Sequence, residues 1–166
     1  GQRGNLVFNH DDLGNIIQNN IFAFATSGQM FRHGDTGRLD QTGILYRNIF
    51  YWKNDKLFGR DKWPEVNRGP WKTHLPDWTT DFDIVMDYNL YYDAGGQPVK
   101  FLTFTFDEWK KKGMGKSSIV ADPLFVDPEN GDFTLKPDSP AFKLGFKPID
   151  LTGVGPRPRP GPRSPE

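Results

Sequence analysis

The chain carries short apolar runs that recur in one pattern. After a variable first residue, each run has two adjacent apolar residues, two polar or aromatic residues, an asparagine, an aliphatic residue and an aromatic residue, and it occupies residues 15–22, 43–50 and 84–91. Apolar runs this short are typical of strands. Each block therefore predicts two short strands joined at its asparagine. Because the two apolar positions are neighbours, their pattern leaves open which of them faces a core.

The aligned asparagines are Asn20, Asn48 and Asn89, and an aspartate stands eight residues before each of them. Strand pairs that recur at such intervals are typical of a parallel β-solenoid, in which each coil stacks on the next. Asparagine suits the corner of a coil because it tolerates left-handed backbone angles, and stacked asparagines can form hydrogen bonds along the stack. An ordinary β-sandwich with three similar strands is the alternative.

Two further elements interrupt the repeat. The second interval between asparagines is longer than the first, which predicts that much of the charged, turn-rich run at residues 53–80 leaves the stack as a long loop. Three tryptophans in that run argue against disorder. Thr105 and Glu108 form a capping box, which predicts a short helix over residues 107–112 with Trp109 as its buried anchor.

The sequence of the last third predicts an ordered C-terminal region followed by a disordered tail. Two short strands, at residues 121–126 and 131–135, flank a turn, and Ser139 then caps a helical turn. The proline- and arginine-rich end of the chain cannot bury a core. We therefore expect one all-β domain with a C-terminal cap region over residues 1–154, and a disordered tail over residues 155–166.

Composition narrows the classes of partner. Lys and Arg together number 21, as do Asp and Glu, so the chain lacks the surplus of positive charge that nucleic-acid binding needs. No apolar run in the sequence is long enough to span a membrane. The absence of cysteine excludes disulfides, thiolate zinc sites and a cysteine nucleophile. We expect neither a nucleic acid nor a membrane as partner.

Several segments resemble the C-terminal part of bacterial right-handed parallel β-helix proteins, a pectate-lyase-like group that includes many secreted glycoside hydrolases and polysaccharide lyases. The segments that carry the resemblance are residues 14–24, 47–52, 87–92, 144–149 and, most specifically, 121–141. The resemblance implies coils of a right-handed parallel β-helix with a long inserted loop, one short helix and a C-terminal cap. Full members of the group are several times longer, so it also implies a fragment of a longer protein.

The resemblance to glycoside hydrolases directs attention to carboxylates, because hydrolysis of a glycosidic bond uses two of them. Acidic and basic side chains gather on the segments that enter and leave the first block. The candidate catalytic residues are Asp11, Asp12 and Asp35, and the candidate substrate-binding residues of this cluster are His10, Arg32 and His33. A solvated loop rich in charge is the alternative for the whole cluster.

Other interpretations stay open for single residues. Asp12 aligns with Asp40 and Asp81, and three matched aspartates before a strand are typical of turns or caps. The cluster offers hard oxygen ligands for calcium, yet their spacing does not match an EF-hand loop, so we expect no metal and no other cofactor. Trp63 and Trp71, in the long loop, are candidate sugar-binding residues, and the alternative is that they anchor the loop on the stack.

We therefore expect a secreted protein, extracellular or periplasmic, that hydrolyses glycosidic bonds of a polysaccharide or oligosaccharide. A polysaccharide lyase and a non-catalytic structural or carbohydrate-binding solenoid are the alternatives. A glycosidase needs two carboxylates that face one groove, whereas a lyase needs a Lys or Arg base. An exposed first coil also presents unpaired strand edges, which predicts self-association.

Overall fold

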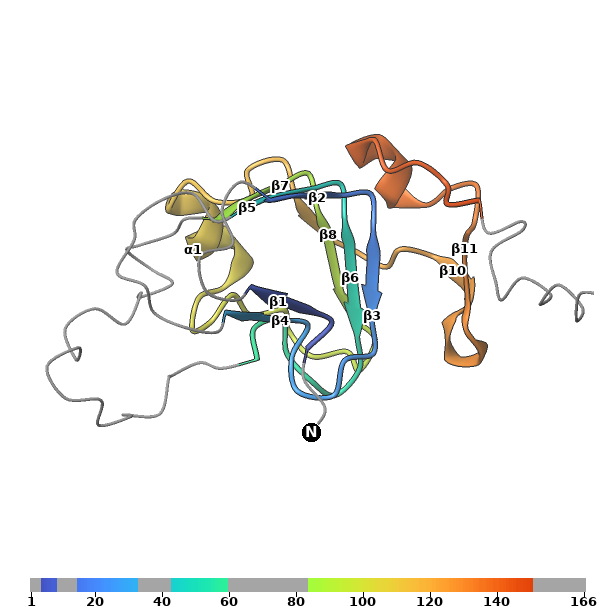
Figure 1. The fold of residues 1–166 in the computed structure, drawn as a ribbon, viewed down its shortest axis with the longest axis horizontal. Helices are drawn as coiled ribbons and strands as arrows, with labels where there is room; N and C mark the ends of the chain where they lie inside the picture. The colour runs from blue at the N-terminus through green and yellow to red at the C-terminus, as the bar shows by residue number, and fades with distance from the viewer. Residues whose placement is uncertain (1–3, 9–14, 33–42, 60–83, 151–166) are drawn as a thin grey trace, which may run out of the picture.

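Figure 1 shows the fold of the computed structural model, which describes residues 4–8, 15–32, 43–59 and 84–150. These residues form mostly short strands in parallel sheets, together with one short helix. This architecture agrees with the all-β class expected from the sequence. The tail expected at residues 155–166 lies outside the described residues.

The three blocks of the sequence build two parallel sheets. The first strands of the blocks form one sheet, in the order β2 (Asn15–Gln18), β5 (Gly43–Tyr46) and β7 (Ile84–Asp87). The second strands form the other, in the order β3 (Ile21–Ala23), β6 (Ile49–Trp52), β8 (Leu90–Asp93) and β9 (Ile119–Val120). Asn15 pairs with Gly43 and Gly43 with Ile84, which confirms the register in which the sequence aligns the blocks.

A third set of extended segments lies opposite these sheets. β4 (Met30–Arg32) pairs in parallel with β1 (Leu6–Phe8). On its other side, Met30 bridges to Phe58 of the next repeat, and the backbone N–H of Met30 donates to the carbonyl of Leu57 at 2.8 Å. Equivalent positions of successive repeats therefore lie side by side around a common interior (Figure 1).

The beginning of the run expected to form a long loop belongs to this third set. Leu57 and Phe58 are buried, because they continue the second repeat beside Met30 instead of leaving the stack. The rest of that run, residues 60–80, lies outside the described residues.

The left-handed residue of each corner is the one before the aligned asparagine. Asn19, Arg47 and Tyr88 have φ angles of 57°, 54° and 56°. The aligned asparagines themselves, for which the sequence analysis expects left-handed angles, do not take them. The chain turns one residue earlier, and the asparagine that follows directs its side chain along the stack.

The aligned asparagines form a ladder of hydrogen bonds. Oδ1 of Asn48 accepts from the backbone N–H and from Nδ2 of Asn20, at 3.1 and 3.2 Å. Oδ1 of Asn89 accepts in the same way from Asn48, at 2.9 and 3.2 Å. The backbone N–H of Asn89 donates to Oγ of Ser118 at 3.0 Å, where the ladder ends. Asn48 and Asn89 are buried with their polar atoms bonded, which confirms the bonding along the stack expected from the sequence.

Burial along the strands shows which apolar position of each block faces the core. Leu45 and Met86 are buried, whereas Ile16 is 65% and Val85 39% exposed. Successive side chains of a strand point to opposite faces of its sheet. The second apolar position of each block therefore points inward, and the first points outward.

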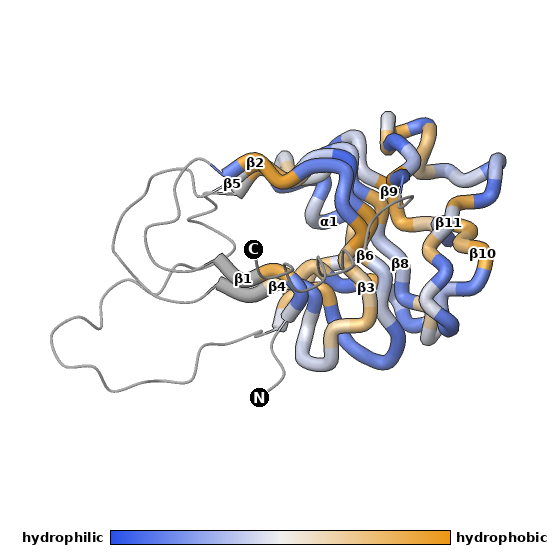
Figure 2. Tube along the Cα trace, turned by 45° about the vertical axis from the view of Figure 1, so that its right-hand side comes forward, coloured by the Kyte–Doolittle hydropathy of each residue, from blue (hydrophilic) through white to orange (hydrophobic). Residues whose placement is uncertain are grey.

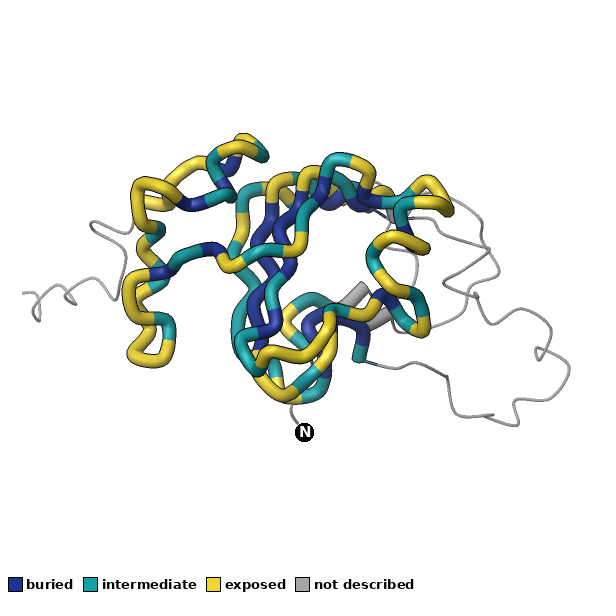
Figure 3. Tube along the Cα trace, turned by 180° about the vertical axis from the view of Figure 1, so that it is seen from behind, coloured by how far each residue is buried: buried dark blue, intermediate teal, exposed yellow. Residues whose placement is uncertain are grey.

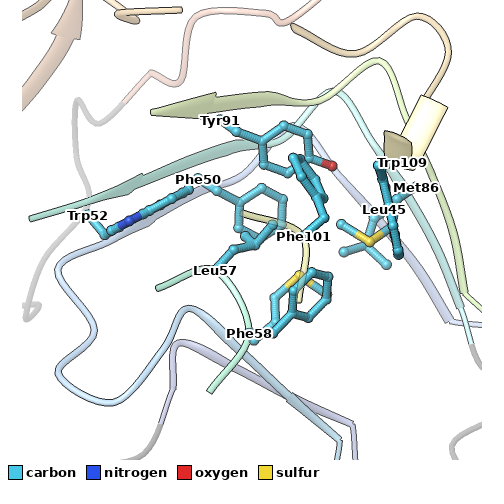
Figure 4. Close-up of a cluster of buried hydrophobic side chains, with 10 residues drawn as sticks. Leu45, Phe50, Trp52, Leu57, Phe58, Met86, Tyr91, Phe101 and Trp109 are labelled. Atoms are coloured by element: carbon cyan, nitrogen blue, oxygen red, sulfur yellow. The ribbon is translucent and has the colours of Figure 1, made fainter. Parts of the chain in front are cut away.

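A stack of aromatic rings runs through the interior. The ring of Phe50 lies between those of Phe22 and Tyr91, with centroid distances of 5.1 and 5.4 Å. Phe101 meets Tyr91 edge-on at 4.9 Å, and Trp109 stacks on Phe101 at 5.3 Å. These rings and their aliphatic neighbours form the main core (Figure 4).

The helix α1 (Phe106–Lys111) begins at the capping box that the sequence predicts. Oγ1 of Thr105 accepts from the backbone N–H of Glu108 at 3.3 Å, and Oε2 of Glu108 accepts from the backbone N–H of Thr105 at 2.7 Å. The bond from the Thr105 backbone is the main reason why the pKa of Glu108 is lowered. Trp109 is buried, as the sequence predicts.

The C-terminal third covers the outer face of the sheet that contains β6. It consists of the antiparallel strands β10 (Phe125–Asp127) and β11 (Asp132–Leu135), joined by the 3-10 turn Pro128–Asn130, and of the 3-10 turn Pro140–Leu144. Tyr51 of β6 meets the ring of Phe125 at 5.4 Å. Oγ of Ser139 accepts from the backbone N–H of Ala141, which confirms the predicted cap. Figure 3 shows that most buried positions lie in the central strands.

We expect Asn48→Ala to lower the free energy of unfolding by about 3 kcal/mol, because it leaves several buried polar groups without partners. One of them is the carbonyl of Ile17, to which Nδ2 of Asn48 donates at 2.8 Å. The matched control is Asn20→Ala at the exposed end of the ladder, for which we expect a loss of about 1 kcal/mol. Urea unfolding of both variants measures the difference, and equal losses would contradict the ladder.

Candidate functional site

The candidate site residues from the sequence lie almost entirely outside the described residues. These residues are His10, Asp11, Asp12, His33, Asp35, Trp63 and Trp71. Asp40 and Asp81, which align with Asp12, also lie outside the described residues. The backbone of Arg32 is described as the end of β4, without its side chain. The roles assigned to these residues therefore stay predictions.

The strands that flank the candidate carboxylates are described, and they are neighbours at both ends. Phe8 and Arg32, the last residues of β1 and β4, are paired. Asn15 and Gly43, the first residues of β2 and β5, are paired as well. The two segments that carry the candidate carboxylates thus begin at adjacent strand ends and end at adjacent strand starts.

A third connection begins and ends beside these two. Before it, Phe58 bridges to Met30 of β4, and after it, Ile84 of β7 pairs with Gly43 of β5. The segment between Phe58 and Ile84 carries both candidate tryptophans. All the candidate residues therefore belong to the ends or the interior of three successive connections between the same two sets of strands.

The outer face of the sheet β2–β5–β7, onto which these connections lead, carries apolar and aromatic residues together with Gln18 and Asp87, both of which pair with Tyr46. We call the apolar and aromatic part of this face the tyrosine face, and it consists of Ile16, Ile44, Tyr46, Val85 and Tyr88. The rings of Tyr46 and Tyr88 meet nearly at right angles, with centroids 6.2 Å apart. Tyr88 is 42% exposed. Figure 2 shows β2 in orange, the colour of hydrophobic residues.

A cation lies beside the tyrosine face. The guanidinium carbon of Arg47 is 5.7 Å from the centroid of the Tyr88 ring. Gly145 allows this placement, because a Cβ atom there would come within 2.8 Å of Nε of Arg47. The C-terminal segment is held next to this corner by two bonds between Asn19 and the backbone of Lys147, at 2.6 and 3.0 Å.

Exposed rings and a guanidinium can serve ligand binding. Aromatic faces pack on apolar C–H surfaces, and an arginine donates hydrogen bonds to hydroxyl or carboxylate oxygens. Sequence reasoning missed Tyr46, Arg47 and Tyr88 as binding candidates, because the repeat did not show which of its positions face outward. The repeat alignment did place Arg47 and Tyr88 in one column, which was the available signal.

A second group of polar side chains lies where the C-terminal hairpin covers the other sheet. Burial raises the pKa of Tyr51, and the charges of Glu129 and Asp122 add to this effect. Burial also raises the pKa of Tyr92, assisted by the charge of Asp122 and by a hydrogen bond to it. Nζ of Lys53 forms an ion pair with Glu129 at 2.8 Å.

These contacts have a structural explanation. The Tyr51 ring packs against Phe125 of the hairpin, and the pair formed by Lys53 and Glu129 links the end of β6 to the turn of the hairpin. The carboxylate of Asp122 accepts from the backbone N–H of Leu124 at 2.8 Å. We interpret this group as the attachment of the hairpin to the sheet, and not as a catalytic site.

Within the described ranges, no three His, Asp or Glu side chains are grouped so that they could hold a metal ion. The calcium ligands considered from the sequence, Asp11, Asp12 and Asp35, lie outside these ranges. The helical part that is described contains no segment of the length and hydropathy needed to cross a membrane. Comparison of the chain with protein-family models, with curated proteins and with solved structures found no match.

We expect Tyr51, Tyr91 and Tyr92 to ionise above the ordinary value of 10.0, because burial raises the pKa of all three. The neutral phenols therefore favour the folded state below pH 10, and this contribution to stability is lost as the pH rises through their raised pKa values. NMR titration of the protein with tyrosines labelled at Cζ follows each group.

The variant Glu129→Gln should bring the pKa of Tyr51 closer to its ordinary value, because it removes a neighbouring negative charge. Asp138→Asn, in an exposed turn, is the control and should leave the titration of Tyr51 unchanged. A Tyr51 that ionises at or below the ordinary value in the folded protein would contradict the packing of the hairpin.

Proposed function

We propose that the chain forms coils of a right-handed parallel β-helix in a secreted carbohydrate-active protein that hydrolyses glycosidic bonds of a polysaccharide. The support for the β-helix is the parallel pairing of equivalent strands in three sets, with an asparagine ladder at one corner. Stacked repeats of this kind are typical of solenoids. The resemblance of the chain to β-helix enzymes supplies the reaction class.

The observation that carries the proposal is the shared start and end of the connections that hold the candidate carboxylates. β1 and β4 end side by side, and β2 and β5 begin side by side. Neighbouring strands are about 4.8 Å apart, which is close to the separation of about 5 Å that a retaining glycosidase needs between its two carboxyl groups. We propose Asp35 as one partner of the catalytic pair and Asp11 or Asp12 as the other.

The tyrosine face supports the choice of a carbohydrate as ligand. Its residues Ile16, Ile44 and Val85 follow the strand starts at which the connections end. The two tyrosine rings, with Arg47 beside them, lie at the far ends of the same strands. Sugar rings have apolar C–H faces and polar edges, so such a surface can pack on the first and bond to the second. Trp63 and Trp71 would extend this surface, with His10, Arg32 and His33 bonding to sugar hydroxyls.

The tyrosine face also favours a second candidate function, which is carbohydrate binding without catalysis. Binding through this face needs no carboxylates. A non-catalytic carbohydrate-binding solenoid would use the same rings and Arg47 without cleaving the polymer. The two functions differ in whether the ligand is consumed. A lyase differs from both, because its product carries a new carbon–carbon double bond that absorbs ultraviolet light.

We expect the chain to release reducing ends from at least one member of a panel of neutral and acidic polysaccharides. Asp35→Asn should reduce this rate by about 10²-fold or more, because it removes a general acid, base or nucleophile. Asp11→Asn and Asp12→Asn are tested in the same way. The variant whose rate falls by a similar factor identifies the second catalytic carboxylate. Asp138→Asn, in an exposed turn described by the structure, is the matched control and should keep the full rate.

The same assay separates the alternatives. Unsaturated products would show a lyase. Binding of a polysaccharide that depends on Tyr88 but releases no product would identify the non-catalytic protein. Hydrolysis that survives all three Asp→Asn changes would show that the catalytic residues are elsewhere.

A further inference from the structure

In the part of the chain that the structure describes, one end of the stack is open. β2 and β3 are the outermost strands of their sheets, and within the described residues neither has a strand on its outer side. We call this surface the open edge, and its side chains that take part in the interior are Ile17, Asn20 and Phe22. The backbone groups along a sheet edge can pair with another strand, although the carbonyls of Gln18 and Ala23 already accept hydrogen bonds from side chains.

At the opposite end the chain continues the sheet that contains β8, whereas β7 is, like β2, the last described strand of its sheet. β9 pairs with β8, and Oγ of Ser118 accepts the backbone N–H of Asn89, which is the last rung of the ladder. Phe101 and Phe106 pack on the ring of Tyr91, at 4.9 and 6.4 Å between centroids. The two ends therefore differ at the sheet that contains β8 and at the ladder, which Ser118 completes at this end alone among the described residues.

The ladder leaves an unused acceptor at the open edge. Oδ1 of each later asparagine receives two bonds, one from the backbone N–H and one from Nδ2 of the asparagine before it. Asn20 donates to Asn48 and to the carbonyl of Gln18, but no described residue donates to its Oδ1. The geometry of the ladder thus specifies what is missing, which is one more asparagine in register.

The apolar side chains of the open edge are also less covered than their equivalents. Leu45 and Met86 are buried, whereas Ile17 in the same row is only partly buried. Phe50 is buried between two rings, whereas Phe22 stacks on Phe50 alone within this row. A further layer of the same pattern would cover both positions.

The third set of strands already extends into that layer. β1 lies beyond β4 on the side of the open edge, while the positions beside β2 and β3 hold no described strand. Nδ2 of Asn5 donates to the carbonyl of Ala23 and to Oε1 of Gln29, both at 2.8 Å, so the residue before β1 bonds to the end of β3. The space for the added strands is therefore bounded on one side by β1.

We propose that the open edge binds a partner polypeptide segment of two short strands and a corner, which adds as a parallel layer and whose corner asparagine donates to Oδ1 of Asn20. The segment carries an inward aliphatic residue to cover Ile17 and an aromatic residue to stack on Phe22. Main-chain bonds to a strand edge supply affinity in such recognition, and alternate side chains supply specificity. The occupant is thus defined by the pattern of the repeats themselves.

A second copy of the chain fits this edge less well. Its own open edge presents the same acceptor, Oδ1 of Asn20, and at its other end Ser118 completes the ladder. Two open edges that face each other would bring two acceptors together without a donor. The self-association expected from the sequence is therefore the competing outcome of the test.

A synthetic peptide with the sequence of residues 43–56 is the probe, because it contains a complete strand–corner–strand unit and charged residues for solubility. We expect the full chain to bind it, with slower hydrogen exchange at the amides of residues 15–23. The same peptide with Asn48→Asp loses the side-chain donor, keeps the backbone N–H, and places a negative charge against the Oδ1 acceptor of Asn20. We expect it to bind at least about tenfold more weakly.

The matched control is the peptide with Ile44→Thr, at the outward position, whose dissociation constant should stay within about twofold of the original. The proposal is wrong if no peptide binds, or if protection appears at strands other than β2 and β3. It is also wrong if the Asn48→Asp peptide binds as well as the original. Sedimentation that shows a stable dimer with β2 and β3 already protected would assign the edge to a second copy instead.

Discussion

The asparagine ladder is the constraint on which the rest of the structure depends. Each rung joins the corner of one repeat to the corner of the next through both the side chain and the backbone, and Asn48 and Asn89 do so in a buried environment where an unpaired amide is costly. A shift of one residue between repeats would break every rung and would turn Leu45 and Met86 outward. The ladder therefore holds the register of both parallel sheets, and with it the ring stack of Phe22, Phe50 and Tyr91.

The same register brings together the parts of the chain that we connect with function. Because successive repeats are aligned strand by strand, the connections between them start and end at neighbouring positions, whatever their length. Chemical groups on these connections can vary without disturbing the core, while the tyrosine face is held on strands that the core supports. In the function that we propose, the strands supply the binding surface and the connections supply the reactive side chains, as in many folds in which loops on a scaffold carry function.

Much of this fold could be predicted from the sequence, because it is encoded by local or repeated signals. The alignment of three blocks is sufficient for the register, Thr105 and Glu108 for the start of the helix, and Ser139 for the last turn. Which of the two apolar positions in each block faces the core could not be predicted, because adjacent apolar residues lack the alternation of apolar and polar residues that marks the two faces of a strand. The placement of Leu57 and Phe58 in the core depends on contacts with Met30, a repeat away, and the attachment of the hairpin through Tyr51 and Phe125 is equally non-local. Of the candidate site, sequence reasoning selected charged motifs on the connections but missed Tyr46, Arg47 and Tyr88, which become a surface only when the sheet shows its outer face.

Hydrogen exchange of the asparagine side-chain amides, followed by NMR, tests the ladder most directly. We expect the Nδ2 protons of Asn48 and Asn89 to exchange much more slowly than those of Asn130, whose side chain is exposed and, among the described residues, bonds to Asp127 alone. We also expect short proton–proton distances between the side chains of Asn20, Asn48 and Asn89. Exchange at Asn48 and Asn89 as fast as at Asn130, in a protein that is folded by other measures, would contradict the ladder and with it the register of the stacked repeats.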